Sequence, residues 1–386
     1  MKKVLFVIPM YDTIGPRSIR FKNLLANFSK DFASDFVFDV LKFDIASSSS
    51  PSIFTLPLSN WVTHLIFGRS IFAKLAGILI RPDVKLLSLF SLASYFKQIR
   101  KTSDSAYTVM VFTRPFSYYL GGFIAKKWYS KRAITVLDLG DPYYQNSATT
   151  TTIFNKWFEQ FCLRYYDYLV VTNIATKNFM IETYGFLPDR IAVIPQGTIA
   201  VDSSEFINTP QPQSGAVVFS YAGAFYAGLR EPYSFLKAIQ LINRTDLAVQ
   251  FIGVAPVWTK DYPFVQHLPR MENAAVMAAY MKSDVLVFFD NAYGIQTSGK
   301  IYELVALNKP LLLITTVTRR YIFDEFKDLE GVVIADETVA SIQKQILYLL
   351  EGSLPCDRSA VQLRYSWHAR SVSYLEFLSQ MVDGKA

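Results

Sequence analysis

The sequence predicts an α/β protein with two doubly wound domains, each built on a parallel β-sheet between helices. Short apolar runs, typical of buried parallel strands, alternate with helical patterns along the chain. A stretch at 199–215, rich in Ser, Pro, Gln and Asn, interrupts this alternation and indicates a linker. The 386 residues are too many for one ordinary core and enough for two.

The first half carries six apolar runs with helical patterns between them. Arg17–Phe28, for example, places its apolar side chains on one helical face. Strands that alternate with helices indicate a Rossmann-like sheet. The predicted strands are Val4–Ile8, Phe36–Leu41, Thr108–Phe112, Ala133–Leu137, Tyr168–Val171 and Ile191–Ile194.

A second alternating set follows the linker, with helices such as Tyr233–Ile242 and Thr338–Leu350. We therefore predict Rossmann-like domains at 1–198 and 216–365, joined by the linker and followed by a terminal helix at 366–386. The strands predicted for this half are Val217–Tyr221, Ala248–Ile252, Val285–Phe289, Leu311–Ile314 and Val332–Ile334.

Composition narrows the class of protein. A chain with 51% hydrophobic and 18% charged residues can bury large cores and is not disordered. The net charge of +7 suits anionic partners: phosphorylated ligands, anionic lipid or nucleic acid. Two cysteines without CxxC or zinc spacing, and three histidines, make a metal site unexpected.

The beginning of the chain predicts a strand rather than a secretory signal. The lysines and apolar run resemble a signal peptide, but Pro9 ends the run before the roughly 7–15 apolar residues that secretion needs. No uninterrupted apolar stretch reaches the roughly 18 residues of a membrane-spanning helix. We expect a cytoplasmic protein.

The segment Leu56–Lys101 departs from the α/β pattern. It is apolar, aromatic and basic, and Asp83 is its single acid. An amphipathic segment with Lys and Arg on its polar face can lie in a membrane interface. The alternative is a pair of core helices with solvated lysines. Because a soluble surface helix normally mixes both signs of charge, we favour peripheral attachment of 56–101 to the anionic inner face of the cell membrane.

The most specific motif is the segment Gln296–Leu311, which reads QTSGKIYELVALNKPL between two predicted strands. Thr297 or Ser298 can cap a helix beginning near Gly299, whose free N–H groups would form a diphosphate site. Lys300 would add positive charge, and Glu303 could accept bonds from ribose hydroxyls. On spacing alone, an ordinary capped helix explains the segment equally well.

Two segments of the first half place charged residues after strands. Asp138 and Asp141 leave the end of a predicted strand, where doubly wound folds bind ligands. Asp141 is a candidate to contact or deprotonate a ligand hydroxyl; the alternative, favoured for Asp138, is that the two carboxylates cap the following turn. In the loop after the first strand, Gly15 allows close backbone approach and Arg17 would face the ligand.

Together these segments resemble glycosyltransferases of the GT-B fold, in particular the broad glycosyltransferase family 4 of bacterial surface polysaccharide type. The likeness is most specific at 296–311, where the resemblance implies a donor-phosphate loop at Thr297, Ser298 and Gly299 and a ribose contact at Glu303. Many members carry a second Glu eight positions earlier, where Ile295 stands here. Asp290 is a possible substitute.

Two further segments resemble the same family. Phe219–Phe225, followed by Gly228-Leu229-Arg230, is similar to the first strand of its nucleotide domain. The resemblance implies that Gly223 lets the diphosphate approach and that Arg230 pairs with it; Lys300 would replace a lysine that members carry after the arginine. Tyr166–Asn173 and Ile194–Gly197 resemble the end of the acceptor domain and are expected to be structural.

The resemblance implies two Rossmann-like domains facing across a cleft. A sugar would pass from a nucleotide diphosphate sugar to a hydroxyl of a lipid-linked saccharide, with retention of configuration; a true base at Asp141 would favour inversion. Asp141, Arg230 and Lys300 would be catalytic, the cations stabilising the departing diphosphate without metal or cofactor.

Two alternative functions remain open. They are a sugar-nucleotide epimerase of GT-B type, and a non-catalytic protein that binds a nucleotide sugar or lipid head group. Nucleic acid is not an expected partner, because the basic residues of 56–101 cluster with aliphatic ones and form no recognition motif.

Overall fold

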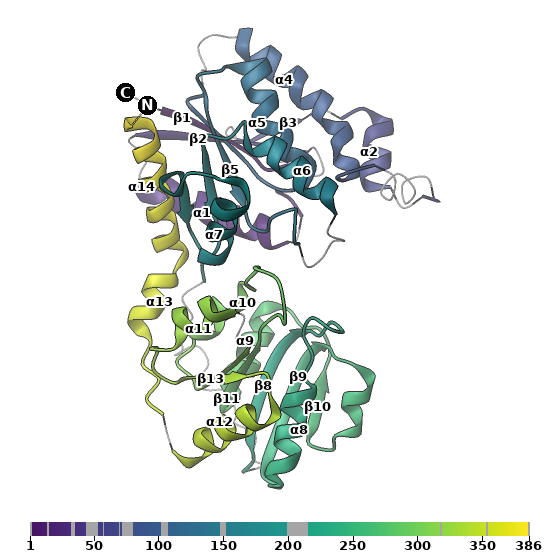
Figure 1. The fold of residues 1–386 in the computed structure, drawn as a ribbon, viewed down its shortest axis with the longest axis vertical. Coiled ribbons are helices and arrows are strands. Elements are labelled where there is room, and N and C mark those ends of the chain that lie inside the picture. The colour runs from purple at the N-terminus through teal and green to yellow at the C-terminus, as the bar shows by residue number, and fades with distance from the viewer. Residues whose placement is uncertain are drawn as a thin grey trace. The chain divides into compact units, whose positions relative to one another are not determined.

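The computed structural model describes residues 2–13, 15–31, 35–43, 53–56, 58–68, 70–71, 80–101, 107–146, 152–198, 215–316, 319–352 and 354–384. The chain divides into two compact units (Figure 1). The first unit comprises Met1–Gln196 together with Trp367–Ala386, and the second comprises Gly197–Ser366.

The first unit is built on a seven-stranded parallel sheet in the order β3-β2-β1-β4-β5-β6-β7. The direction of winding reverses between β1 and β4, and such a switch point is where doubly wound sheets bind ligands. The strands are β1 (Lys2–Val7), β2 (Phe36–Phe43), β3 (Ile53–Leu56), β4 (Val109–Phe112), β5 (Ile134–Leu139), β6 (Tyr168–Val171) and β7 (Ile191–Val193).

One face of this sheet is covered by α1 (Pro16–Asp31) and α14 (Trp367–Asp383), which also pack against each other. Phe6 of β1 contacts Phe21 of α1, with ring centroids 5.7 Å apart, and Tyr374 of α14 at 6.2 Å. The apolar side of α14 thus completes the core of the first unit.

The other face is covered by α4 (Leu89–Lys101) and α5 (Gly121–Ile124). Side chains alternate along a strand: Val111 belongs to the Phe6 cluster, and the next residue, Phe112, packs on Phe96 of α4 at 6.3 Å. A side chain at Gly121 would overlap the Phe112 ring, so α5 lies close to the sheet. The remaining helices are α2 (Asn60–Phe67), η1 (Val84–Ser88), η3 (Phe116–Leu120), η4 (Ala125–Tyr129), α6 (Ile153–Leu163), α7 (Ile174–Tyr184) and η5 (Pro188–Arg190).

The second unit has a six-stranded parallel sheet in the order β10-β9-β8-β11-β12-β13, which reverses between β8 and β11. Its strands are β8 (Val217–Ala224), β9 (Leu247–Val254), β10 (Val265–Leu268), β11 (Val285–Phe289), β12 (Leu311–Thr315) and β13 (Val332–Asp336). Its helices are α8 (Tyr233–Ile242), η7 (Val257–Asp261), α9 (Asn273–Lys282), α10 (Lys300–Val305), α11 (Arg320–Phe326), α12 (Val339–Glu351) and α13 (Ser359–Tyr365).

The fold class predicted from the sequence is confirmed, since both units are parallel sheets flanked by helices. The two strands that were not predicted, β3 and β10, are edge strands. Both are four residues long and partly exposed, so they lack the continuous apolar run of a central strand.

The segment Leu56–Lys101 is described only in part, because 57, 69 and 72–79 lie outside the described residues. Within it, α4 buries Leu92 and Phe96 and exposes Lys97 and Arg100. This is the arrangement of the alternative interpretation, a core helix with solvated basic residues. No helix in the described ranges has the length and apolar character needed to cross a membrane.

Candidate functional site

Two polar clusters lie where the sheets reverse, one in each unit. The second unit gathers cations after β8. Arg230 donates to the Asn291 side-chain oxygen at 2.7 Å, and its buried Nε has no hydrogen-bond partner among the described residues. Lys300 donates to the carbonyl of Ala222 at 2.6 Å. Within the described ranges neither cation forms an ion pair with a carboxylate, so their charge is available to an anion.

The electrostatics tie three of the predicted residues together. Burial lowers the pKa of Lys300, Glu303 opposes the change, and Arg230 and Arg270 lower it further. Burial likewise raises the pKa of Glu303, and the Lys300 charge partly offsets it. Lys300 therefore lies within electrostatic reach of Arg230, of Glu303 and of the exposed Arg270.

Gly223 lies in the same site, near the end of β8, and steric contacts explain the absence of a side chain. A Cβ at Gly223 would overlap the Tyr221 hydroxyl. The neighbouring Gly253 has a φ of +117°, and a Cβ at that position would overlap the Gly223 carbonyl oxygen. Both glycines allow β8 and β9 to approach closely where β8 ends.

The loop between β11 and α10 is held by a buried arginine. Arg319 pairs with Asp290 through Nε at 2.5 Å and Nη2 at 3.1 Å, and it donates to the carbonyl oxygens of Gly294 and Gln296. Asp290 also accepts from Thr315 at 2.9 Å. Asp290 thus shapes the loop through Arg319, and its possible role in place of the missing family Glu stays a prediction.

The predicted cap of the next helix was wrong. The helix α10 begins at Lys300, and its N-cap is Gly299, which makes no side-chain capping bond. The hydroxyl of Thr297 instead lies 3.4 Å from that of Tyr321, and the Ser298 carbonyl accepts from the Ile301 N–H. The helix has six residues, so positive charge in this site comes mainly from side chains.

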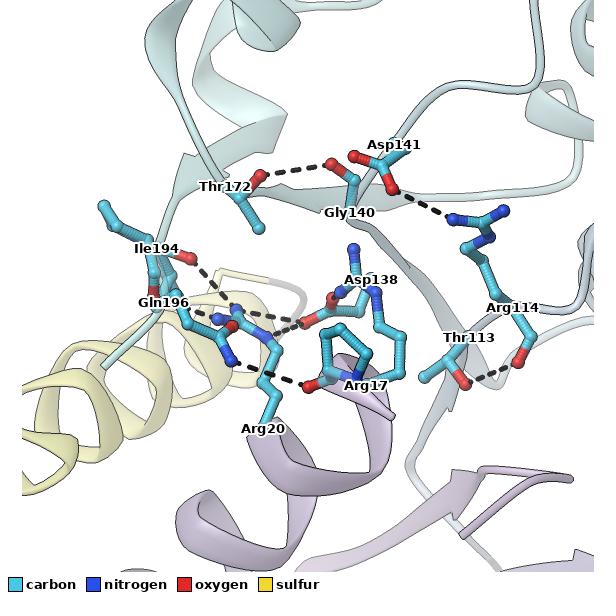
Figure 2. Close-up of polar contacts among 12 residues, drawn as sticks. Arg17, Arg20, Thr113, Arg114, Asp138, Gly140, Asp141, Thr172, Ile194 and Gln196 are labelled. Carbon is cyan, nitrogen blue, oxygen red and sulfur yellow. Dashed lines mark hydrogen bonds and ion pairs between the residues drawn. The ribbon is translucent and has the colours of Figure 1, made fainter. Parts of the chain in front are cut away.

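In the first unit, a buried carboxylate binds two arginines of α1 (Figure 2). Asp138, at the end of β5, accepts from Arg17 at 2.6 Å and from Arg20 at 3.3 Å. Arg20 also donates to the carbonyl oxygens of Ile194 and Pro195. The interpretation of Asp138 as a turn cap was therefore wrong. Its full burial is compensated by the two guanidiniums.

Asp141 belongs to a second, more exposed pair. Its carboxylate accepts from Arg114, which follows β4, at 2.9 Å, and both side chains are about one-third exposed (Figure 2). The backbone carbonyl of Asp141 accepts from Tyr119 at 3.0 Å. The structure thus places Asp141 at a solvent-accessible strand end, beside a guanidinium that the sequence did not suggest.

Hydrogen bonds to Glu159 of α6 hold the loop that carries Asp141. The Glu159 carboxylate accepts from the backbone N–H groups of Tyr143 at 2.7 Å and Tyr144 at 3.1 Å, and from the Tyr184 hydroxyl at 2.6 Å. Burial raises the pKa of Glu159 to about 7, although these hydrogen bonds oppose the shift. Glu159 is a positioning residue for this loop.

The Arg17 guanidinium packs against Gly140, where an added Cβ would overlap it. We expect Gly140→Ala to displace Arg17 from Asp138 and to lower the free energy of unfolding by about 1–3 kcal/mol. Gly15→Ala is the matched control, because nothing lies within 4 Å of its Cβ position. Equal urea midpoints for the two variants would contradict this assignment.

Sequence reasoning missed Arg20, Arg114, Glu159 and Arg319 as parts of these clusters. Arg114 and Arg319 lie in the segments that follow β4 and β12, and a search for charges in the loops after every strand would have found them. In the described part of the chain, no group of three or more His, Cys, Asp or Glu residues could hold a metal ion.

No protein-family model and no curated protein sequence matches the chain. Solved structures, in contrast, are similar to the chain. The sucrose-phosphate synthase of Thermosynechococcus elongatus is similar over 100% of both chains, at 12% identity and a TM-score of 0.69. The lipopolysaccharide outer core galactosyltransferase WaaB is similar over 99% of this chain and 100% of its own, with 13% sequence identity and a TM-score of 0.66. Anabaena HepE, solved with UDP and glucose, is similar over 98% of this chain and 100% of its own, with 13% sequence identity and a TM-score of 0.62. The chain therefore has the GT-B fold.

Proposed function

We propose that the protein is a glycosyltransferase that moves a sugar from a nucleotide diphosphate sugar to a hydroxyl of a lipid-linked saccharide in bacterial glycan assembly. The observation that carries the proposal is the pair Arg230 and Lys300, two cations without carboxylate partners in the described ranges, beside Glu303. HepE, a protein of the same fold, was solved with UDP and glucose.

The chemistry of the pair suits a diphosphate. Placing the Arg230 guanidinium near the Lys300 ammonium is unfavourable: the pKa of Lys300 is lowered mainly by burial and further by Arg230 and Arg270. A diphosphate would relieve the repulsion and give the Arg230 Nε a partner. The same charges would stabilise the diphosphate as it leaves, which is how cations replace a metal in such a transfer. Glu303 would bind the ribose.

The acceptor would bind in the first unit, with Gly15 and Arg17 in its loop. Asp141 is the proposed contact to the acceptor hydroxyl because it is solvent-accessible at a strand end. Its pairing with Arg114 orients the carboxylate. Retention of configuration is the expected outcome, and the enzyme would work at the cytoplasmic face of the membrane, with 56–101 nearby.

Thermal shift with uridine, guanosine and thymidine diphosphate sugars tests the proposal. One class should stabilise the wild type, and Glu303→Ala should lose most of that stabilisation because the ribose contact is gone. Glu351→Ala, at the exposed end of α12, should respond as the wild type does. Stabilisation by none of the three classes would contradict the donor site. Turnover of the sugar nucleotide without acceptor would indicate an epimerase, and binding without turnover would indicate a non-catalytic protein.

A further inference from the structure

The helix α6 presents an apolar stripe to solvent. Ile153 is 79% exposed, Trp157 is 61% exposed and Phe154 is 39% exposed. Ile153 and Trp157 are four residues apart and so share one face of the helix, whereas Phe158, which stacks on Phe154 with centroids 5.9 Å apart, is buried. An exposed Trp and Ile on one helix turn are unusual for a surface that contacts only water.

The stripe continues as a row of aromatic rings onto α5. Trp157 stacks on Phe161 with centroids 6.0 Å apart and an interplanar angle of 19°. Phe161 in turn contacts Phe123 of α5 at 6.1 Å and Tyr165 at 5.4 Å. The contacts hold the rings as a preformed surface, so ordering them on binding would cost little entropy.

Basic side chains frame this row. Lys127 of η4 lies over the rings of Phe123, at 5.3 Å, and Trp128, at 5.0 Å, and Lys97 of α4 lies 3.9 Å from the Trp128 centroid. Contacts join α4 to η4 and α5 to α6. Across α4, α5, η4 and α6 the single acid is Glu159, which is buried. The exposed charge of these four helices is therefore entirely positive.

We propose that this face, defined by Ile153, Phe154, Trp157 and Phe161 with Lys97 and Lys127, docks on an anionic lipid bilayer. Trp and apolar side chains would enter the interface while the lysines contact lipid phosphates. A second copy of the chain fits less well, because a twofold contact would bring the same positive charges together. The inference rests on the proposed function for its purpose, which is access to a lipid-linked acceptor. It extends the membrane contact from 56–101, which contains Lys97, to α6 and η4.

Co-sedimentation with vesicles of phosphatidylglycerol and phosphatidylcholine in equal parts tests the proposal. We expect Ile153→Ser/Trp157→Ser to bind at least about tenfold more weakly than wild type, and Lys97→Gln/Lys127→Gln to lose the salt-sensitive part of binding. Val257→Ser/Leu363→Ser, at similarly exposed apolar positions in the second unit (79% and 74%), should bind as wild type.

Several outcomes would overturn the proposal. The first is that the wild-type protein does not sediment with the vesicles. The second is that wild type and the α6 variant bind equally. The third is that Trp61→Ser, in the 56–101 segment, abolishes binding while the α6 variant still binds. A wild-type dimer that the α6 substitutions dissociate, without vesicle binding, would assign the face to a second copy instead. Nucleotide-induced thermal shift of the same variants separates this test from the proposed function, since loss of docking should leave that shift intact.

Discussion

Replacing Lys300 by Gln is expected to weaken binding of the nucleoside diphosphate roughly 10- to 150-fold at neutral pH, the cost of one charged hydrogen-bond partner. Within the described residues, the Lys300 ammonium donates to the Ala222 carbonyl in a partly buried contact, and Arg230 repels it. An anion is therefore its natural partner. Isothermal titration calorimetry with the nucleotide class found by thermal shift measures the effect.

The same lysine predicts a pH dependence. Burial and the nearby arginines lower the pKa of Lys300 in the free protein from its ordinary value of 10.5, and a bound diphosphate would raise it again. Affinity should be full below the free-protein pKa and fall as the pH rises through it, because binding then requires uptake of a proton. In Lys300→Gln this alkaline decline should disappear.

Lys237→Gln provides the control. Lys237 lies on α8 of the same unit and donates to Gln240 at the surface, at 3.0 Å. Its loss should leave both affinity and pH profile unchanged. An equal loss of affinity in the two variants, or an alkaline decline that persists in Lys300→Gln, would show that Lys300 does not bind the diphosphate.

Arg319→Met is expected to lower the free energy of unfolding by about 3–5 kcal/mol, the usual cost of breaking a buried ion pair from one side. The side chains of Arg319 and Asp290 are 2% and 1% exposed. Without the guanidinium, Asp290 would be an unpaired buried charge, and the carbonyl oxygens of Gly294 and Gln296 would lose their donor. Urea denaturation followed by circular dichroism measures the change.

The neighbouring residue offers a matched control. Arg320 pairs with Asp324 at 3.8 Å, and their side chains are 80% and 50% exposed. Arg320→Met should change stability by less than about 0.5 kcal/mol, because exposed pairs contribute little. Adding Asp290→Leu to Arg319→Met should restore only part of the loss, since the two carbonyl oxygens stay without a donor. Full recovery, or equal effects of the two single variants, would contradict the role of Arg319 as the clamp of this loop.

The sequence alone determined the α/β class and most of the strands. A central parallel strand is buried on both faces, so it must be a continuous apolar run such as Val4–Ile8 or Val285–Phe289, and that run is visible without knowing its neighbours. The edge strands Ile53–Leu56 and Val265–Leu268 are partly exposed and have a mixed pattern, so the same signal was absent.

Only the tertiary structure decided which charges pair. Arg20 and Asp138 are 118 residues apart in the chain, and Arg319 and Asp290 are 29 apart. Whether two such groups meet depends on which strands lie side by side and on how deeply each end is buried, which local periodicity does not encode. Thr297 shows the same limit: its type suits a helix cap, but its hydroxyl lies beside Tyr321. Sequence pattern thus placed candidate residues at strand ends, and packing determined whether each charge was neutralised inside the protein or left for a ligand.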